Sequence, residues 1–133
     1  MIGIWGDYSA AFLRVLAAGV LLFFGLPMLI HPLGWAKALR WKLPEHTHLA
    51  IYFGRCLAGL ICVMALFALR AAADPSVRLF YFDFIMSCFV AMTAVHIYGA
   101  IRKIQPTSET LEIGFWALLL ALAFCFYPVN LIR

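Results

Sequence analysis

Four long apolar stretches make up most of this 133-residue chain, and they limit the folds that it can adopt. They cover residues 10–30, 49–69, 77–100 and 110–129. A helix needs about 20 mostly apolar residues to cross the hydrocarbon core of a bilayer, and each stretch has that length. We therefore predict an all-α integral membrane protein, a single four-helix bundle domain formed by residues 1–133.

The composition supports this prediction. Hydrophobic residues make up 66% of the chain, charged residues make up 12%, and the mean hydropathy is +1.00. A soluble domain usually has about 25% charged residues. The net charge is +4, but the basic residues lie at the ends of the apolar stretches, where anionic lipid headgroups are a simpler partner than nucleic acid. We therefore expect membrane lipids as partners and no nucleic acid.

The segment of residues 32–44, between the first two stretches, has a different composition. It contains two tryptophans and three basic residues, namely Trp35, Trp41, Lys37, Arg40 and Lys42. Tryptophan and basic residues together are typical of the boundary between membrane and water. We predict a short interfacial segment on the side opposite the N-terminus. We name the N-terminal side "side A" and this opposite side "side B".

The sequence gives weaker information on orientation and on processing. Four basic residues belong to side A and five to side B, which slightly favours side B as the cytoplasmic side. No Lys or Arg precedes the first stretch, so we expect it to be a retained span rather than a cleaved signal. The four cysteines lie within the apolar stretches, where we interpret them as small buried hydrophobic residues.

Two helix starts are marked by capping residues. Asp74 is followed by a proline, and this pair predicts the N-cap and first residue of the third span. Thr107 or Ser108 is expected to cap the fourth span. Glu109 and Glu112 then fall near its start, where the helix dipole favours negative charge.

Two ionisable residues inside the first and third stretches have opposite charges. Arg14 and Asp83 lie at similar depth from side A, so we predict a structural ion pair between them. Each shares a helical face with small residues, namely Ala18 and Gly25 for the first and Ser87, Ala91 and Ala94 for the second. The first and third spans are therefore expected to pack through these stripes. The pair either sets the order of the helices or forms a polar site open to side A.

A second group of ionisable residues lies toward side B. Arg55, His96 and Glu112 come from three different stretches and could line one polar pocket under the interfacial segment. In one interpretation these groups satisfy one another and the headgroups. In a second, the pocket binds the polar head of a lipid or a quinone, with Arg55 and His96 as donors. A third interpretation is a metal or a haem.

Histidine is the commonest metal ligand, and His46 and His48 form a loose H-x-H pattern. Residues two positions apart on a helix point in different directions, however, and the nearby Arg55 would oppose a cation. We therefore predict no metal site, with His46 and His48 as the candidate ligands if one exists.

Three segments carry a resemblance to a known group of proteins. They are "FLRVLAAGVLLFFGLPMLIHPLGWAKAL", "IYFGRCLAGLICVMAL" and "AMTAVHIYGA". The chain resembles the DoxX-like group of small bacterial four-span membrane proteins, and its layout is similar to that of the eukaryotic Erg28-like scaffold proteins. The resemblance implies a four-helix bundle, the bacterial inner membrane, and a link to quinone oxidation or to scaffolding. The C-x-x-C motif of thiol-linked relatives is absent.

The functional expectation is a non-catalytic accessory or scaffold subunit that packs against other membrane proteins or against copies of itself. A lipid or quinone headgroup is its expected ligand, bound at Arg55, His96 and Glu112. The alternative is a small quinone-linked oxidoreductase component in which His96 carries protons, because free histidine titrates near physiological pH. A transporter or channel is favoured less, because the chain lacks interrupted spans in matched halves.

Overall fold

The computed structural model describes residues 2–132, which form helices and connecting turns. The elements are η1 (Gly6–Tyr8), α1 (Ser9–Val20), the π-helical η2 (Leu21–Gly25), α2 (Leu26–Ile30), α3 (Pro32–Ala38), α4 (His48–Ala73), α5 (Pro75–Arg102), α6 (Thr107–Cys125) and η3 (Val129–Leu131). Four helices are long and apolar enough to cross a membrane: Gly6–Ile30, α4, α5 and α6. The predicted all-α fold with four long apolar helices is confirmed.

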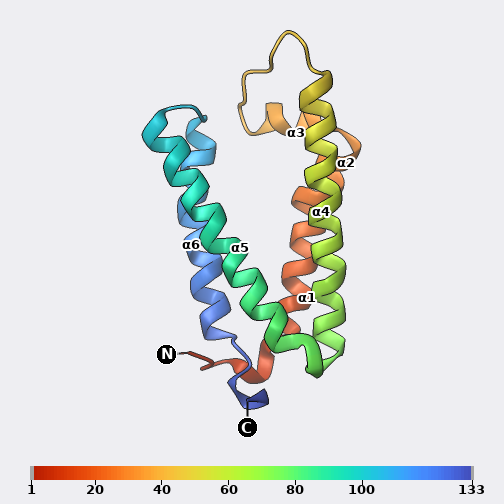
Figure 1. Cartoon of the computed structure of the whole chain (residues 1–133), viewed down its shortest axis with the longest axis vertical. Coiled ribbons are helices and arrows are strands. Elements are labelled where there is room, and N and C mark those ends of the chain that lie inside the picture. The colour runs from red at the N-terminus through yellow and green to blue at the C-terminus, as the bar shows by residue number, and fades with distance from the viewer. Residues whose placement is uncertain (1, 133) are drawn as a thin grey trace.

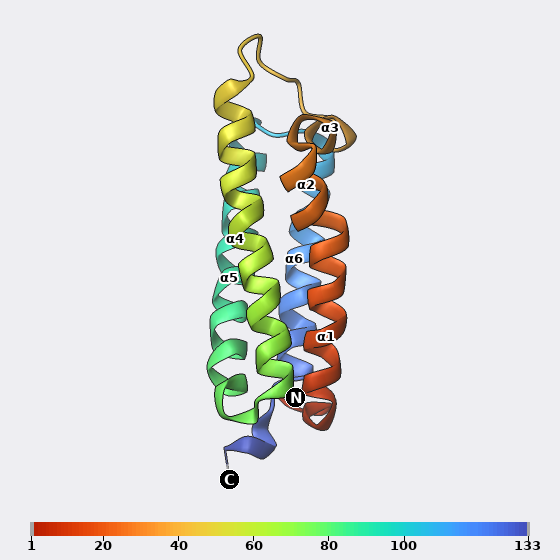
Figure 2. The same ribbon diagram turned by 90° about the vertical axis from the view of Figure 1, so that its right-hand side faces the viewer.

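The chain runs along the bundle four times, and both termini lie at the same end (Figure 1). This end is side A, and the turn between α5 and α6 lies at side B. The helix α3 also lies toward side B, across the bundle axis, and the loop to α4 extends beyond it (Figure 1 and Figure 2). The predicted short segment between the first two long helices therefore exists and contains one helix of seven residues.

The long helices form two pairs. The first pair is α1 with α2 against α4, and the second is α5 against α6. Figure 1 shows the two pairs close together at side A and diverging toward side B. Hydrogen bonds join α4 to α5 in the side A half: the Tyr81 hydroxyl donates to the Met64 carbonyl at 2.8 Å, and the Arg78 guanidinium donates to the Ala71 and Ala72 carbonyls.

The hydrophobic core lies in the side A half of the bundle. Its fully buried members include Leu13 and Ala17 of α1, Ala65 and Ala68 of α4, and Phe82 of α5. Small residues allow helices to approach closely, and alanines supply this property on α4. The core therefore depends on a few large side chains packed against an alanine-rich helix.

The first long helix contains a π-helical segment just before a proline. Pro27 has no backbone N–H, so the carbonyl of Phe23 four residues earlier loses its usual helical donor. The indole N–H of Trp35 donates to this carbonyl at 3.0 Å. This bond holds α3 against the end of the preceding helix, and it gives Trp35 a structural role.

One predicted cap is confirmed and the other is wrong. The Asp74 carboxylate accepts hydrogen bonds from the backbone N–H and the hydroxyl of Ser76, at 2.9 and 2.6 Å. At α6 the N-cap is Pro106, and no side chain caps this helix. The Ser108 hydroxyl donates instead to the Leu39 carbonyl, and it thereby joins the start of α6 to the segment that follows α3.

Candidate functional site at side B

The site is centred on His96, whose exposed fraction is 5%. His96 lies on the same face of α5 as the buried Ile85 and Phe89. Its Nδ1 atom lies 2.8 Å from the Met92 carbonyl oxygen. A carbonyl can only accept a hydrogen bond, so Nδ1 carries the hydrogen and donates. This bond sets the orientation of the ring.

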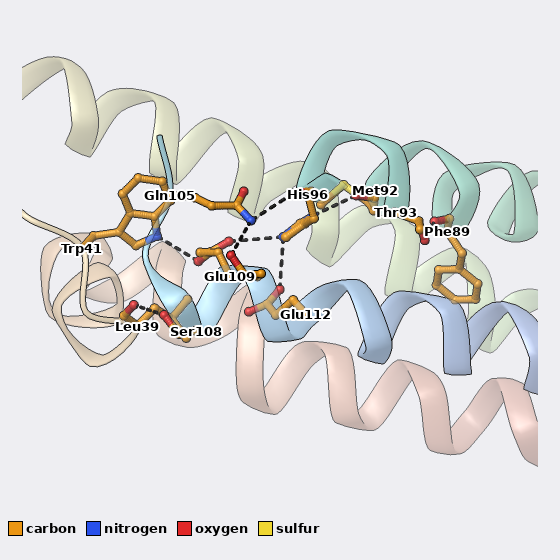
Figure 3. A network of polar contacts seen from close by, with 11 residues as sticks. Leu39, Trp41, Phe89, Met92, Thr93, His96, Gln105, Ser108, Glu109 and Glu112 are labelled. Carbon is orange, nitrogen blue, oxygen red and sulfur yellow. Dashed lines mark hydrogen bonds and ion pairs between the residues drawn. The ribbon is translucent and has the colours of Figure 1, made fainter. Parts of the chain in front are cut away.

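The other ring nitrogen of His96 faces two carboxylates of α6 (Figure 3). Its Nε2 atom lies 3.2 Å from Oε2 of Glu109 and 3.4 Å from Oε2 of Glu112. The two glutamate side chains are only 12% and 17% exposed. They are three residues apart, so they share one face of the helix. We call His96, Glu109 and Glu112 the His–Glu–Glu cluster.

Three segments of the chain hold the cluster in place. Trp41, in the loop after α3, donates its indole N–H to Oε1 of Glu109 at 2.8 Å. Gln105, in the turn between α5 and α6, donates to the His96 carbonyl at 3.0 Å and to the Thr110 hydroxyl at 3.2 Å. Figure 3 shows Trp41 and Gln105 on the outer side of the cluster. The cluster thus lies where α5, α6 and the loop after α3 meet.

A further polar group lies beside the cluster. Trp116 is one helical turn after Glu112 on the same face of α6, and its ring centroid is 6.0 Å from that of His96. The Trp116 Nε1 atom is buried, and its N–H is within reach of the Glu112 carboxylate.

The structure brings together two of the three residues predicted for a side B pocket. His96 and Glu112 meet, as described above. Arg55 is exposed on α4, and within the described chain it forms no hydrogen bond or ion pair with the cluster. The physical reason is the divergence of α4 from α5 toward side B (Figure 1). The predicted pocket therefore loses its basic member.

The third residue of the cluster is Glu109, whereas the sequence predicts Arg55 at this position. From the sequence alone, Glu109 is interpreted only as a charge that complements the helix dipole. Its spacing of three residues from Glu112 was the available signal, because this spacing puts both carboxylates on the face that one histidine can reach. Trp41 was predicted at the membrane boundary, and its bond to Glu109 could not be read from composition.

The predicted ion pair between Arg14 and Asp83 is not formed among residues 2–132. Arg14 is exposed on α1, and Oδ1 of Asp83 accepts a hydrogen bond from the Tyr127 hydroxyl at 2.8 Å. This bond, together with partial burial, raises the pKa of Tyr127. The buried face of α1 carries Leu13 and Ala17, so the stripe of Arg14 and its neighbours turns outward.

The small residues of the predicted α5 stripe are exposed as well: Ser87, Ala91 and Ala94. The first long helix packs mainly on α4, and it meets α5 through the Phe12 and Phe82 rings, which lie 5.9 Å apart. Of the predicted contact residues, Gly25 is buried, and a Cβ atom there would lie 2.9 Å from the Cys62 sulfur of α4.

The remaining predicted residues lie near side B. His46 and His48 are exposed at the start of α4 and belong to no group of three metal-ligand side chains in the described chain. The group that does have such geometry is the His–Glu–Glu cluster, whose donor atoms lie within 4.8 Å of one another. Lys37, Arg40 and Lys42 are exposed, and their contact with lipid headgroups stays a prediction.

Comparisons with known proteins do not add to this geometry. No protein-family model, no curated protein and no solved structure matches the chain. The resemblance to the DoxX-like group therefore stays a prediction, and function has to be inferred from the side chains and their surroundings.

Proposed function

We propose that the chain inserts into a membrane through its four long helices and acts as a non-catalytic accessory or scaffold subunit. Its partner in this proposal is another integral membrane protein or a second copy of the chain. The observation that carries the proposal is Arg55, an exposed charged residue on an apolar helix.

Arg55 lies seven residues after the start of α4, about 10 Å along the helix at 1.5 Å per residue. Tyr52, one helical turn before Arg55, is exposed, and so are the apolar Phe53, Leu57 and Leu60 on the adjoining faces of α4. An ionisable side chain in such a surface is costly unless it meets water, a headgroup or a partner charge. A carboxylate or a carbonyl of a neighbouring subunit would satisfy it.

The limited interior of the bundle also supports the proposal. In the most apolar 18-residue window of α6, only 6% of residues are buried inside the protein, and the other three long helices reach 22–28%. Most of each helix surface is therefore available to lipid or to a neighbouring protein. The resemblance to the DoxX-like group favours the bacterial inner membrane as the membrane concerned.

The proposal is tested by comparing the native complexes of the wild type and of Arg55→Gln. The chain is extracted from its own membranes in a mild detergent, and the mass of the intact complex is measured. We expect the wild type in a stoichiometric complex and Arg55→Gln as a free chain with unchanged helix content. Arg102→Gln, an exposed arginine at the end of α5, is the matched control and should keep the complex. A wild type that runs as a monomer with bound lipid alone would refute the proposal.

The alternative function is a component of a small quinone-linked oxidoreductase. The observation in its favour is the His–Glu–Glu cluster, in which a buried imidazole lies within reach of two carboxylates and could pass protons to a bound quinone. The exposed position of Arg55 removes one predicted donor to a quinone or lipid headgroup. Loss of quinone-dependent electron transfer in a folded His96→Gln variant would favour this alternative.

A further inference from the structure

We propose that His96, Glu109 and Glu112 bind a divalent transition-metal cation, with zinc as the best match to the donor set. The site uses one imidazole nitrogen and two carboxylate oxygens, all within 4.8 Å of one another. Imidazole and carboxylate together are common ligands of zinc. This proposal is independent of the accessory role, because a metal site is compatible with any partner.

The spacing of the donor atoms fits a tetrahedral ion. Zinc binds nitrogen and carboxylate oxygen at about 2.0–2.2 Å, so two ligands in tetrahedral directions lie about 3.4 Å apart. In the structure Nε2 of His96 lies 3.2 and 3.4 Å from the two carboxylate oxygens, and all three donor atoms lie within 4.8 Å of one another. One ion can bridge donor atoms at such separations.

The surroundings orient the ligands toward one another. Because Nδ1 of His96 donates to the Met92 carbonyl, the ring turns Nε2 toward the carboxylates. A metal ion at Nε2 would replace the hydrogen that Nε2 donates to Glu109. The indole N–H of Trp41 holds Oε1 of Glu109, which leaves Oε2 turned toward His96. Partners of this kind orient metal ligands in known sites and tune their affinity.

The charge of the cluster also favours a dication. Metal binding takes the imidazole in its neutral form and the carboxylates in their ionised form, so the three ligands together then carry a charge of −2. Within residues 2–132 no Lys or Arg pairs with either glutamate. A divalent ion would bring the net charge to zero.

Trp116 also borders the proposed site. Its ring centroid lies 6.0 Å from that of His96, and its indole N–H is within reach of the Glu112 carboxylate. Trp116 and Trp41 thus each contact one of the two glutamates, as partners that orient metal ligands do. Three protein ligands leave one tetrahedral position open, which water or another oxygen ligand usually fills.

The test is equilibrium binding of zinc to the full chain in detergent after removal of metals with a chelator. Competition with a chromophoric chelator gives the affinity, elemental analysis gives the stoichiometry, and cobalt(II) gives an absorption spectrum that reports the coordination geometry. We expect one zinc per chain and a four-coordinate cobalt spectrum. His96→Gln and Glu112→Gln should weaken binding by on the order of 100-fold or more, since each removes a ligand.

A milder variant keeps the test decisive if a ligand variant fails to fold. Trp41→Phe removes only the hydrogen bond to Glu109, so the affinity should fall by about 10-fold while the helix content is unchanged. The double variant His46→Ala and His48→Ala is the matched control for histidine content, and Glu45→Gln is the control for an exposed carboxylate. Both should bind zinc as the wild type does.

Two results would overturn the proposal. One is a wild type without saturable zinc binding. The other is binding that survives in folded His96→Gln but disappears in the control that lacks His46 and His48, since the ion would then occupy the exposed histidines.

Discussion

The two ends of the bundle are held together by different kinds of contact. At side A the helices meet through apolar packing, with Leu13, Ala65 and Phe82 fully or almost fully buried. At side B the helical pairs diverge, and the contacts that join the segments are polar, centred on His96 and Glu109.

Side A also has hydrogen bonds, such as those from Tyr81 and Arg78 to carbonyls of α4, but they surround an apolar core. The side B contacts described above are polar and depend on charge and protons. We therefore expect side A to contribute more of the stability and side B to respond more to its surroundings.

The largest expected change in the free energy of unfolding tests the apolar packing at side A. Phe82→Ala removes a fully buried ring from the core, and we expect the free energy of unfolding to fall by about 3–5 kcal/mol. The measurement is a denaturation curve in detergent followed by circular dichroism. Phe80→Ala is the control, because Phe80 is 76% exposed and should change stability little. Equal losses in the two variants would show that side A is not the stable end.

A smaller change in the free energy of unfolding is expected for the polar contacts at side B. The hydrogen bond from Trp41 to Glu109 should contribute about 1 kcal/mol, measured as the coupling in a double-mutant cycle of Trp41→Phe and Glu109→Ala, since alanine removes the acceptor. The cycle is run with excess chelator so that metal does not contribute. The same cycle with Trp5→Phe in place of Trp41→Phe should give no coupling. Additive losses in the first cycle would mean that the loop after α3 is not held by Glu109.

The smallest expected change in stability concerns the Asp74 cap between α4 and α5, and this change depends on pH. Hydrogen bonds from the Ser76 hydroxyl and backbone N–H lower the pKa of Asp74 below its ordinary value of 3.8. The folded-state pKa is the lower one, so this stabilisation is fully present above about pH 4 and is lost as the pH falls through the lowered pKa. Asp74→Asn removes the titrating group.

We therefore expect acid to destabilise the wild type slightly more than Asp74→Asn, in thermal unfolding curves recorded from pH 6 downward. Glu45→Gln, which alters an exposed carboxylate, should follow the wild type. Parallel pH profiles for the wild type and Asp74→Asn would contradict the role given to this cap.

The sequence predicted the long helices because their signal is local. Hydropathy over about 20 residues depends on neighbours in the chain, and the structure confirms all four long helices. The cap at Asp74 is local in the same way, since its acceptor and donors lie within three residues. The end of the last helix was less well defined: α6 ends at Cys125, although the apolar stretch continues to residue 129.

The contacts between helices were harder to predict because a small angular error moves a residue to another surface. The stripe of Arg14 lies about 100° from the buried Leu13, and this difference separates an exposed face from the core. Arg55 was placed with His96 on depth alone, and depth gives no information on which helices diverge. Glu112 was placed correctly because the short turn between α5 and α6 puts it at the level of His96.

The connection between α4 and α5 has a mechanical consequence. A single residue, Asp74, separates the two helices, and α4 then continues for 26 residues, or about 39 Å at 1.5 Å per residue. Because α1, α2 and α3 pack along α4, these helices would tilt together with α4 about that joint. A tilt of about 5° would move the far end of α4 by about 3 Å and Arg55 by about 2 Å relative to α5 and α6.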